Sequence, residues 1–217
     1  MESIEISKIR VEYLPGNPLS LAVMITSDGI IPSAFDAFDT NKASLFCVSC
    51  PDWNRYLSPW PASACFKGGE AFAGEADEYL SLLTKAVLPE AEKHFCLKPE
   101  KRSVLGYSLA GLFALYAFFE TDIFRCAASV SGSMWYDGLL DYLRGKMPPS
   151  NAETVYLSVG DKEANTKNKR LQTVESATVR ACEILKEKNL TVRFELNKGN
   201  HFFEPDLRLL RALNAVT

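Results

Sequence analysis

The chain has 217 residues, of which 47% are apolar and 24% are charged, and its formal net charge is −3. This length suits one α/β domain with a substantial core, and the weak negative charge offers no basic surface for nucleic acid. No uninterrupted apolar run approaches the roughly 20 residues that span a bilayer. We therefore expect a single domain over residues 1–217 that binds neither nucleic acid nor membrane.

Apolar residues switch along the chain between strand-like and helix-like spacing. Strands are expected at 4–13, 19–26, 44–50, 102–107, 126–130, 154–159 and 191–196, and helices at 76–94, 109–120, 168–188 and 205–215. A short helix is also expected over 135–143. Strand–helix alternation after an antiparallel start predicts an α/β fold, with a mostly parallel central sheet and helices on both faces.

Six cysteines are present, and Cys47 and Cys50 have the spacing of a redox or zinc pair. They fall in a predicted strand, where residues three apart point to opposite faces. Residues 1–5 have neither the basic region nor the apolar core of a secretion signal, so we expect a cytoplasmic protein with reduced thiols. We interpret all six cysteines as buried or half-buried free thiols, and we expect no metal and no cofactor.

A glycine–serine turn joins the strand at 102–107 to the helix at 109–120. Ser108 lies in this turn, two residues after Gly106 and two before Ala110. Such a serine is held in a strained conformation with its hydroxyl above the sheet, and its neighbours must be small because the turn brings them close. Alanine, the next smallest residue, stands where a second glycine is usual. The pattern is typical of a nucleophile elbow, although a plain turn could carry the same residues.

An activated serine needs a base, and the base needs a carboxylate that orients it. In α/β-hydrolases the chain order is serine, acid, histidine. Of the two histidines, His94 precedes Ser108 at the polar end of a predicted helix, whereas His201 follows it in a turn after the strand at 191–196. We therefore predict that His201 is the base and that His94 is a surface residue.

The acid is expected where the strand at 154–159 ends, and Gly160-Asp161-Lys162-Glu163 follows there. In hydrolases of this kind the acid commonly lies three residues past the glycine that ends the strand, which favours Glu163. Asp161 is the alternative acid; otherwise it caps the turn through its own backbone.

The elbow, the turn at 160–163 and the segment Asn200-His201-Phe202 resemble the putative-esterase branch of the α/β-hydrolases, which includes esterase D-like and enterochelin esterase-like enzymes. Segments 27–30, 52–60 and 131–136 are also similar to that family, and the resemblance covers most of the chain. It implies an α/β-hydrolase fold and a serine esterase whose Ser-His-acid triad forms an acyl-enzyme.

The resemblance also implies an oxyanion hole. The residue after the nucleophile usually supplies one backbone N–H, here that of Leu109. Similarity to the family's Leu-Asp-Gly segment places the second donor at Ile30; the alternative is that Asp28 and Gly29 form a simple turn.

Loops expected near Ser108 carry the aromatic residues Trp53, Tyr56, Trp60 and Trp135. We predict that they line an apolar substrate pocket, with the alternative that some of them only cover the core. Arg55 either meets an anion on the substrate or forms a surface ion pair.

The expected substrate is a small-molecule ester, of an aromatic or carbohydrate type. A siderophore ester is an alternative, although the sequence shows no cluster of basic residues suited to a large anionic chelate. An acyltransferase or a peptidase with the same triad is another. A non-catalytic binding domain of the same fold would have no need of a candidate for every triad role. The sequence does not indicate an oligomeric state.

Overall fold

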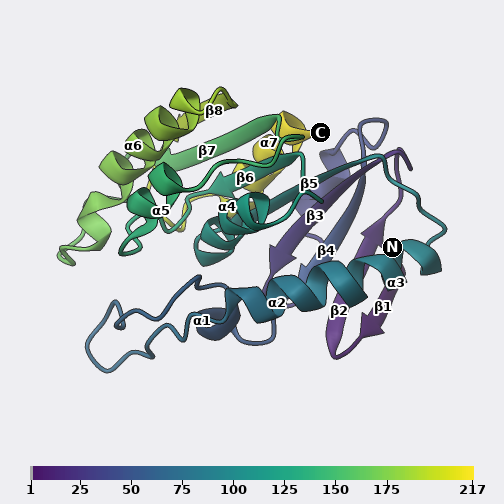
Figure 1. Cartoon of the computed structure of the whole chain (residues 1–217), viewed down its shortest axis with the longest axis horizontal. Helices are drawn as coiled ribbons and strands as arrows, with labels where there is room; N and C mark the ends of the chain where they lie inside the picture. Colours follow the sequence, from purple (N-terminus) through teal and green to yellow (C-terminus); the bar gives the residue numbers. More distant parts are fainter. Residues whose placement is uncertain (1) are drawn as a thin grey trace.

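The computed structural model describes residues 2–217, and its eight strands form one sheet in the order β1-β2-β4-β3-β5-β6-β7-β8 (Figure 1). The strands are β1 (Glu2–Ile6), β2 (Ile9–Leu14), β3 (Ser20–Thr26), β4 (Ser44–Ser49), β5 (Lys101–Tyr107), β6 (Cys126–Val130), β7 (Thr154–Gly160) and β8 (Thr191–Asn197). β2 pairs antiparallel with β1 and β4, and the remaining pairs are parallel. The mostly parallel sheet with an antiparallel start is confirmed.

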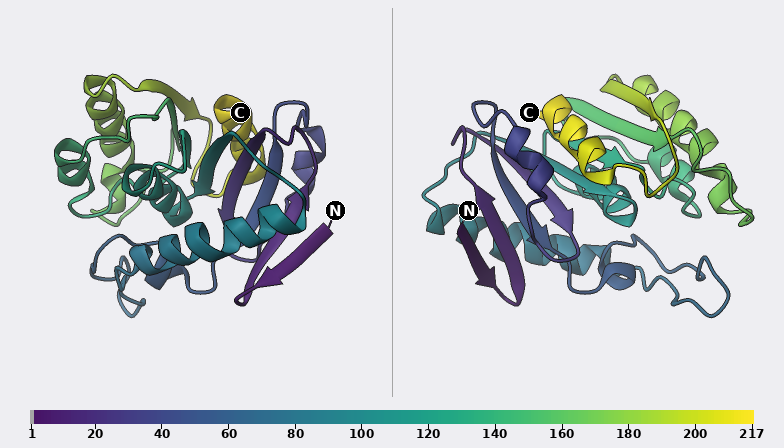
Figure 2. Two further views of the ribbon diagram at one scale, coloured as in Figure 1. Left: turned by 45° about the vertical axis from the view of Figure 1, so that its right-hand side comes forward. Right: turned by 180° about the vertical axis from the view of Figure 1, so that it is seen from behind.

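Helices cover both faces of this sheet, and each face has its own apolar core (Figure 2). One face carries α2 (Ala76–Leu82), η2 (Leu83–Val87), α3 (Leu88–His94), α4 (Leu109–Glu120), α5 (Leu139–Gly145) and α6 (Val174–Glu187), and the other carries η1 (Ser33–Ala37) and α7 (Pro205–Val216). α4 is apolar along almost its whole length and is buried from Leu109 to Phe119. A helix that is apolar all round needs burial on every side, and α4 starts directly after Ser108.

The first predicted strand is instead a hairpin of two strands. The chain reverses at Ser7 and Lys8, which have φ angles of 51° and 66°. Ile6 then pairs with Ile9, and this two-residue turn keeps the apolar alternation on both sides of the reversal. Without Gly or Asn at the turn, the sequence reads as one continuous strand.

The predicted helix at 76–94 is present, but its middle turn widens. α2, η2 and α3 follow one another as one continuous helix (Figure 1), and η2 is a π-helical turn. Pro89 follows η2 closely, and proline has no N–H to donate and crowds the carbonyl group of Lys85, four residues before it. The wider turn accommodates this local loss of hydrogen bonding.

Four other helical segments differ from expectation. The helix expected over 135–143 begins later, as α5, because Gly138 precedes it with φ 81°. The helix expected from residue 168 begins with the 3-10 turn η3 (Leu171–Thr173) before α6. η1 and the single-turn helix α1 (Trp53–Tyr56) were not predicted, because such short segments carry too little periodicity.

Cys47 and Cys50 belong to the cores on opposite faces of the sheet, which confirms that their sulfur atoms diverge. All six cysteines are free thiols. Cys96 is exposed, contrary to expectation, because it lies at φ 54° in the turn that follows α3. Within residues 2–217, no helix combines the length and apolarity needed to cross a membrane.

Candidate active site

Ser108 lies at the turn between β5 and α4, with φ 59° and ψ −121°. This positive φ is strained for a residue with a side chain, as a nucleophile elbow predicts. A Cβ atom on Gly106 would lie 2.5 Å from the carbonyl carbon of Ala110. Gly106 is therefore required by the close approach of Ala110, whereas Ala110 can keep its methyl group because Gly106 has none.

The imidazole of His201 lies between Ser108 and Glu163. Its Nε2 is 3.1 Å from the Oγ of Ser108, and its Nδ1 is 2.7 Å from the Oε2 of Glu163. The three residues follow the ends of β5, β8 and β7, as the topology of a parallel sheet predicts for functional groups. His94 is exposed on α3, which confirms its prediction as a surface residue.

Glu163, rather than Asp161, reaches this imidazole. Its carboxylate is almost fully buried, and Oε1 accepts a 2.7 Å hydrogen bond from the N–H of Gly160. Asp161 accepts a 2.7 Å bond from the N–H of Gly199 instead. Asp161 therefore braces the turn that precedes His201, close to the capping role considered for it.

The pKa of Glu163 is under opposing influences. Burial raises it, but hydrogen bonds from His201 and Ser131, the charge of His201 and the N–H of Gly160 together lower it below its usual value. Glu163 is therefore an anion at neutral pH, and it can hold a proton on the Nδ1 of His201.

The guanidinium of Arg208 lies behind this carboxylate and is fully buried. Its Nη1 is 2.9 Å from the Oε1 of Glu163. Its Nη2 donates to the carbonyl oxygens of Lys198 and Asn200, at 2.9 and 3.0 Å. One buried cation thus connects the carboxylate to the loop that carries His201.

Tyr107 adds a second connection between these groups. Its hydroxyl donates a 2.6 Å hydrogen bond to the backbone oxygen of His201 and accepts a 3.3 Å bond from Arg208. Neither Tyr107 nor Arg208 was predicted as a site residue. A sequence signal for Arg208 exists, because it lies four residues before the buried Ala212 and therefore on the apolar stripe of α7.

A cavity of 670 Å³ opens beside Ser108. Its lining includes five aromatic side chains: Trp53, Phe66, Phe72, Trp135 and Phe202. Phe66 and Phe202 are 63% and 85% exposed, so they stand at its mouth. Two of the residues predicted to bind substrate, Trp53 and Trp135, thus lie beside Ser108.

The other predicted substrate-binding residues do not line this cavity. Arg55 is exposed and forms ion pairs with Glu75 and, at 3.6 Å, with Glu78. Its surroundings match the surface ion pair considered as the alternative.

Tyr56 and Trp60 are half-buried and pack against the core. Tyr56 stacks on Tyr79 with 5.9 Å between ring centroids, and the Nε1 of Trp60 donates a 2.8 Å bond to the backbone oxygen of Asp137. Their contacts match the alternative of a core-covering role.

The two predicted oxyanion donors lie in different surroundings. Leu109 lines the cavity and is the first residue of α4, where backbone N–H groups and the positive end of the helix dipole lie. Ile30 is not among the cavity-lining residues, and its N–H donates a 3.1 Å bond to the Oδ1 of Asp28. Both assignments stay predictions.

Residues 24–205 match the model of a protein family described as "Putative esterase". The chain belongs to this esterase family. A curated relative, "Uncharacterized protein YbbA" of Bacillus subtilis (strain 168), is 29% identical over 138 residues. These residues make up 62% of this chain and 55% of that protein, so the match spans only about half of the relative.

Two solved structures have a similar fold. Siderophore hydrolase EstB from Aspergillus nidulans has a TM-score of 0.72 at 17% identity, and the match covers 99% of this chain and 92% of that one. An IroE-like serine hydrolase from Shewanella oneidensis has a TM-score of 0.73 at 12% identity, over 95% and 74% of the two chains. The predicted α/β-hydrolase fold is thus confirmed. The resemblance to the putative-esterase family is confirmed by the family match.

Arg208→Met tests the buried ion pair between Arg208 and Glu163. We expect it to lower the free energy of unfolding by about 3–5 kcal/mol, because Glu163 is left buried without its cation. The double variant Arg208→Met/Glu163→Gln should recover part of this loss, since the uncompensated charge is gone. Urea unfolding measures all of these variants. The control Arg180→Met, on the exposed side of α6, should stay within about 0.5 kcal/mol of the wild type. An effect of Arg208→Met as small as that of the control would contradict the expectation.

The lowered pKa of Glu163 also predicts a pH dependence of stability. Its ionised form stabilises the fold above the ordinary pKa of 4.5, and this contribution is lost as the pH falls through the lowered value. The difference in unfolding free energy between the wild type and Glu163→Gln should therefore shrink as the pH falls from about 5 to about 3. The difference for the exposed Glu187→Gln should change far less. A Glu163→Gln difference that is independent of pH would be inconsistent with a lowered pKa.

Proposed function

We propose that the protein is a serine carboxylester hydrolase in which Ser108 is the nucleophile. The observation that carries this proposal is the position of His201, with one ring nitrogen 3.1 Å from the Oγ of Ser108 and the other 2.7 Å from the carboxylate of Glu163. In such an arrangement the histidine acts as a general base, and the carboxylate holds its tautomer and stabilises the imidazolium that forms.

The reaction has two halves. The Oγ of Ser108 attacks the ester carbonyl carbon while its proton passes to the Nε2 of His201. The carbon–oxygen bond of the ester then breaks, and His201 gives the proton to the departing alcohol, which leaves an acyl group on Ser108. Water next attacks the acyl carbon and loses a proton to His201, which returns it to Ser108 as the carboxylic acid leaves.

Each half passes through a tetrahedral oxyanion that needs hydrogen-bond donors. We assign the N–H of Leu109 as one donor, because this residue lines the cavity at the start of α4. We retain Ile30 as the second donor, which requires its N–H to exchange the carboxylate of Asp28 for the oxyanion. Removal of one such donor typically costs about 10²–10³ in rate.

The cavity favours an ester with an aromatic or otherwise flat apolar group. Its aromatic walls offer such a group stacking and edge contacts. Among the described residues, Lys162 is the one lysine or arginine that lines the cavity, and two acidic residues, Glu70 and Glu163, also line it. This balance fits a small, weakly charged ester better than a large polyanion.

A siderophore ester is a second candidate, because the name of one structural neighbour is siderophore hydrolase EstB. A panel of esters that varies the acyl and alcohol groups separates the two candidates. Turnover of small aromatic esters at comparable or higher kcat/KM than a catecholate trilactone supports our first choice. A strong preference for the trilactone supports the second. Acyl transfer to an added alcohol, detected as a new ester product, would indicate an acyltransferase.

Ser108→Ala tests the nucleophile. We expect it to lower the turnover of p-nitrophenyl acetate by several orders of magnitude and to abolish labelling by a fluorophosphonate probe, because the attacking oxygen is gone. The matched control is Ser133→Ala, since Ser133 also lines the cavity but the His201 side chain bonds to Ser108 and Glu163 instead. This control should keep its labelling. A wild-type rate in Ser108→Ala would overturn the assignment. Absence of labelling in folded wild-type protein would favour the non-catalytic binding domain.

A further inference from the structure

β8 is the last strand of the sheet, and among residues 2–217 its backbone pairs only with β7 (Figure 2). The outer edge of β8 therefore presents unpaired backbone donors and acceptors. Phe194 and Leu196 of this strand are 40% and 52% exposed. An open edge with exposed apolar side chains is a template for another strand, and natural proteins usually cover or interrupt such an edge. No proline interrupts β8.

We propose that this edge pairs with β8 of a second copy of the chain, antiparallel about a two-fold axis at Phe194. In this register Phe194 faces the partner's Phe194. Val192 faces the partner's Leu196, and Arg193 faces the partner's Glu195. A two-fold axis repeats each of these pairs, so the strand is complementary to itself in both halves of the interface.

The two faces of β8 are consistent with this register. Val192 packs against the core that α6 covers, so Phe194 and Leu196, which alternate with it along the strand, lie on the same face. Glu195 lies on the α7 face, where it accepts a 2.5 Å hydrogen bond from Tyr156. Apolar side chains thus meet apolar ones on the α6 face, and opposite charges meet on the α7 face. Such directly opposed pairs stabilise antiparallel strands.

On the α7 face, Arg193 is available for an ion pair with a second copy. Arg193 has no ion-pair partner within residues 2–217, whereas Glu195 has Arg211 at 3.3 Å. The proposed contact gives the guanidinium of Arg193 a carboxylate on the other copy.

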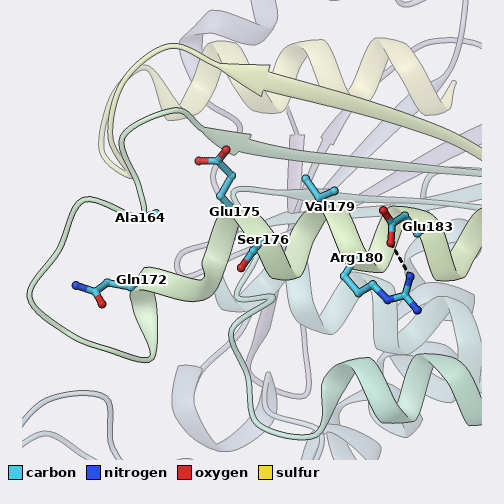
Figure 3. Close-up of a pocket in the computed structure, with 7 residues that line it drawn as sticks. All are labelled: Ala164, Gln172, Glu175, Ser176, Val179, Arg180 and Glu183. Carbon is cyan, nitrogen blue, oxygen red and sulfur yellow. Dashed lines mark hydrogen bonds and ion pairs between the residues drawn. The ribbon is translucent and has the colours of Figure 1, made fainter.

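The apolar strip extends from β8 to α6. Val179 is 40% exposed. Its side chain points from α6 toward the strands, on the same side as Glu175, whereas Ser176 and Arg180 lie on the opposite side of the helix (Figure 3). Val179 therefore widens the apolar surface beside the open edge. Arg180 is paired with Glu183 at 2.6 Å and does not add an unpaired charge to the depression along α6.

The opposite edge of the sheet lacks this complementarity. β1 carries two acidic residues, Glu2 and Glu5, and no basic one. Two copies of β1 paired about Ile4 would place Ser3 against the partner's Glu5 and Glu2 against the partner's Ile6, so no directly opposed pair joins opposite charges. The side chains therefore favour β8, and not β1, as the edge that joins two copies.

Charge exchange on β8 tests the proposal without reference to catalysis. Sedimentation velocity of the wild type should give twice the mass of one chain. Arg193→Glu and Glu195→Arg each place like charges opposite one another, so each variant should self-associate about tenfold or more weakly. An equal mixture of the two should form dimers again, because each acidic position then faces a basic one. The double variant should dimerise for the same reason.

The matched control is Glu5→Arg on β1, which reverses an exposed charge at the other edge and should leave the mass unchanged. Restored dimers in the mixture also show that the single variants are folded. A monomeric wild type at micromolar to submillimolar concentrations would overturn the proposal. So would a dimer that persists in both single variants, or single variants that stay monomeric when mixed.

Discussion

A buried ion pair between Arg208 of α7 and Glu163 after β7 is the constraint on which the arrangement of the site depends. Two opposite charges removed from water must be paired and hydrogen-bonded, or each becomes strongly destabilising. The guanidinium therefore fixes the carboxylate and, through the carbonyls of Lys198 and Asn200, the loop of His201. α7 thus sets the positions of Glu163, which follows β7, and of His201, which follows β8.

Ser108 is held from the opposite side by the sheet. The backbone N–H of Ser108 donates to the carbonyl oxygen of Val130 at 3.0 Å. The backbone carbonyl oxygen of Ser108 accepts from the N–H of Ser133 at 3.0 Å. These bonds and the buried α4 keep the strained turn in place, since such a conformation persists only where its surroundings determine it. Both Ser108 and Glu163 are therefore held by rigid elements, and His201 lies between them with a third of its side chain exposed.

Much of this arrangement could be predicted from short-range patterns. Periodicity located the parallel strands, and the small residues around Ser108 indicated the elbow, because both depend on neighbours in the sequence. The hairpin at Ser7 was missed because its turn lacks the residues that usually mark one. Arg208 was missed because its partner, Glu163, is 45 residues away. The surroundings of Arg55 could not be read from the sequence, since an exposed arginine has the same pattern whether it faces a substrate or Glu75.

In the proposed mechanism Glu163 orients His201, whereas Asp161 only holds the adjacent turn through Gly199. The most direct measurement compares kcat/KM for an ester substrate between Glu163→Gln and Asp161→Asn, which each remove one charge with little change of shape. We predict a loss of about 10³–10⁴ for Glu163→Gln, because the amide no longer enforces the required tautomer. We predict a loss below about tenfold for Asp161→Asn, since its oxygen can still accept from Gly199. Equal losses, or a greater loss in Asp161→Asn, would contradict this role of Glu163.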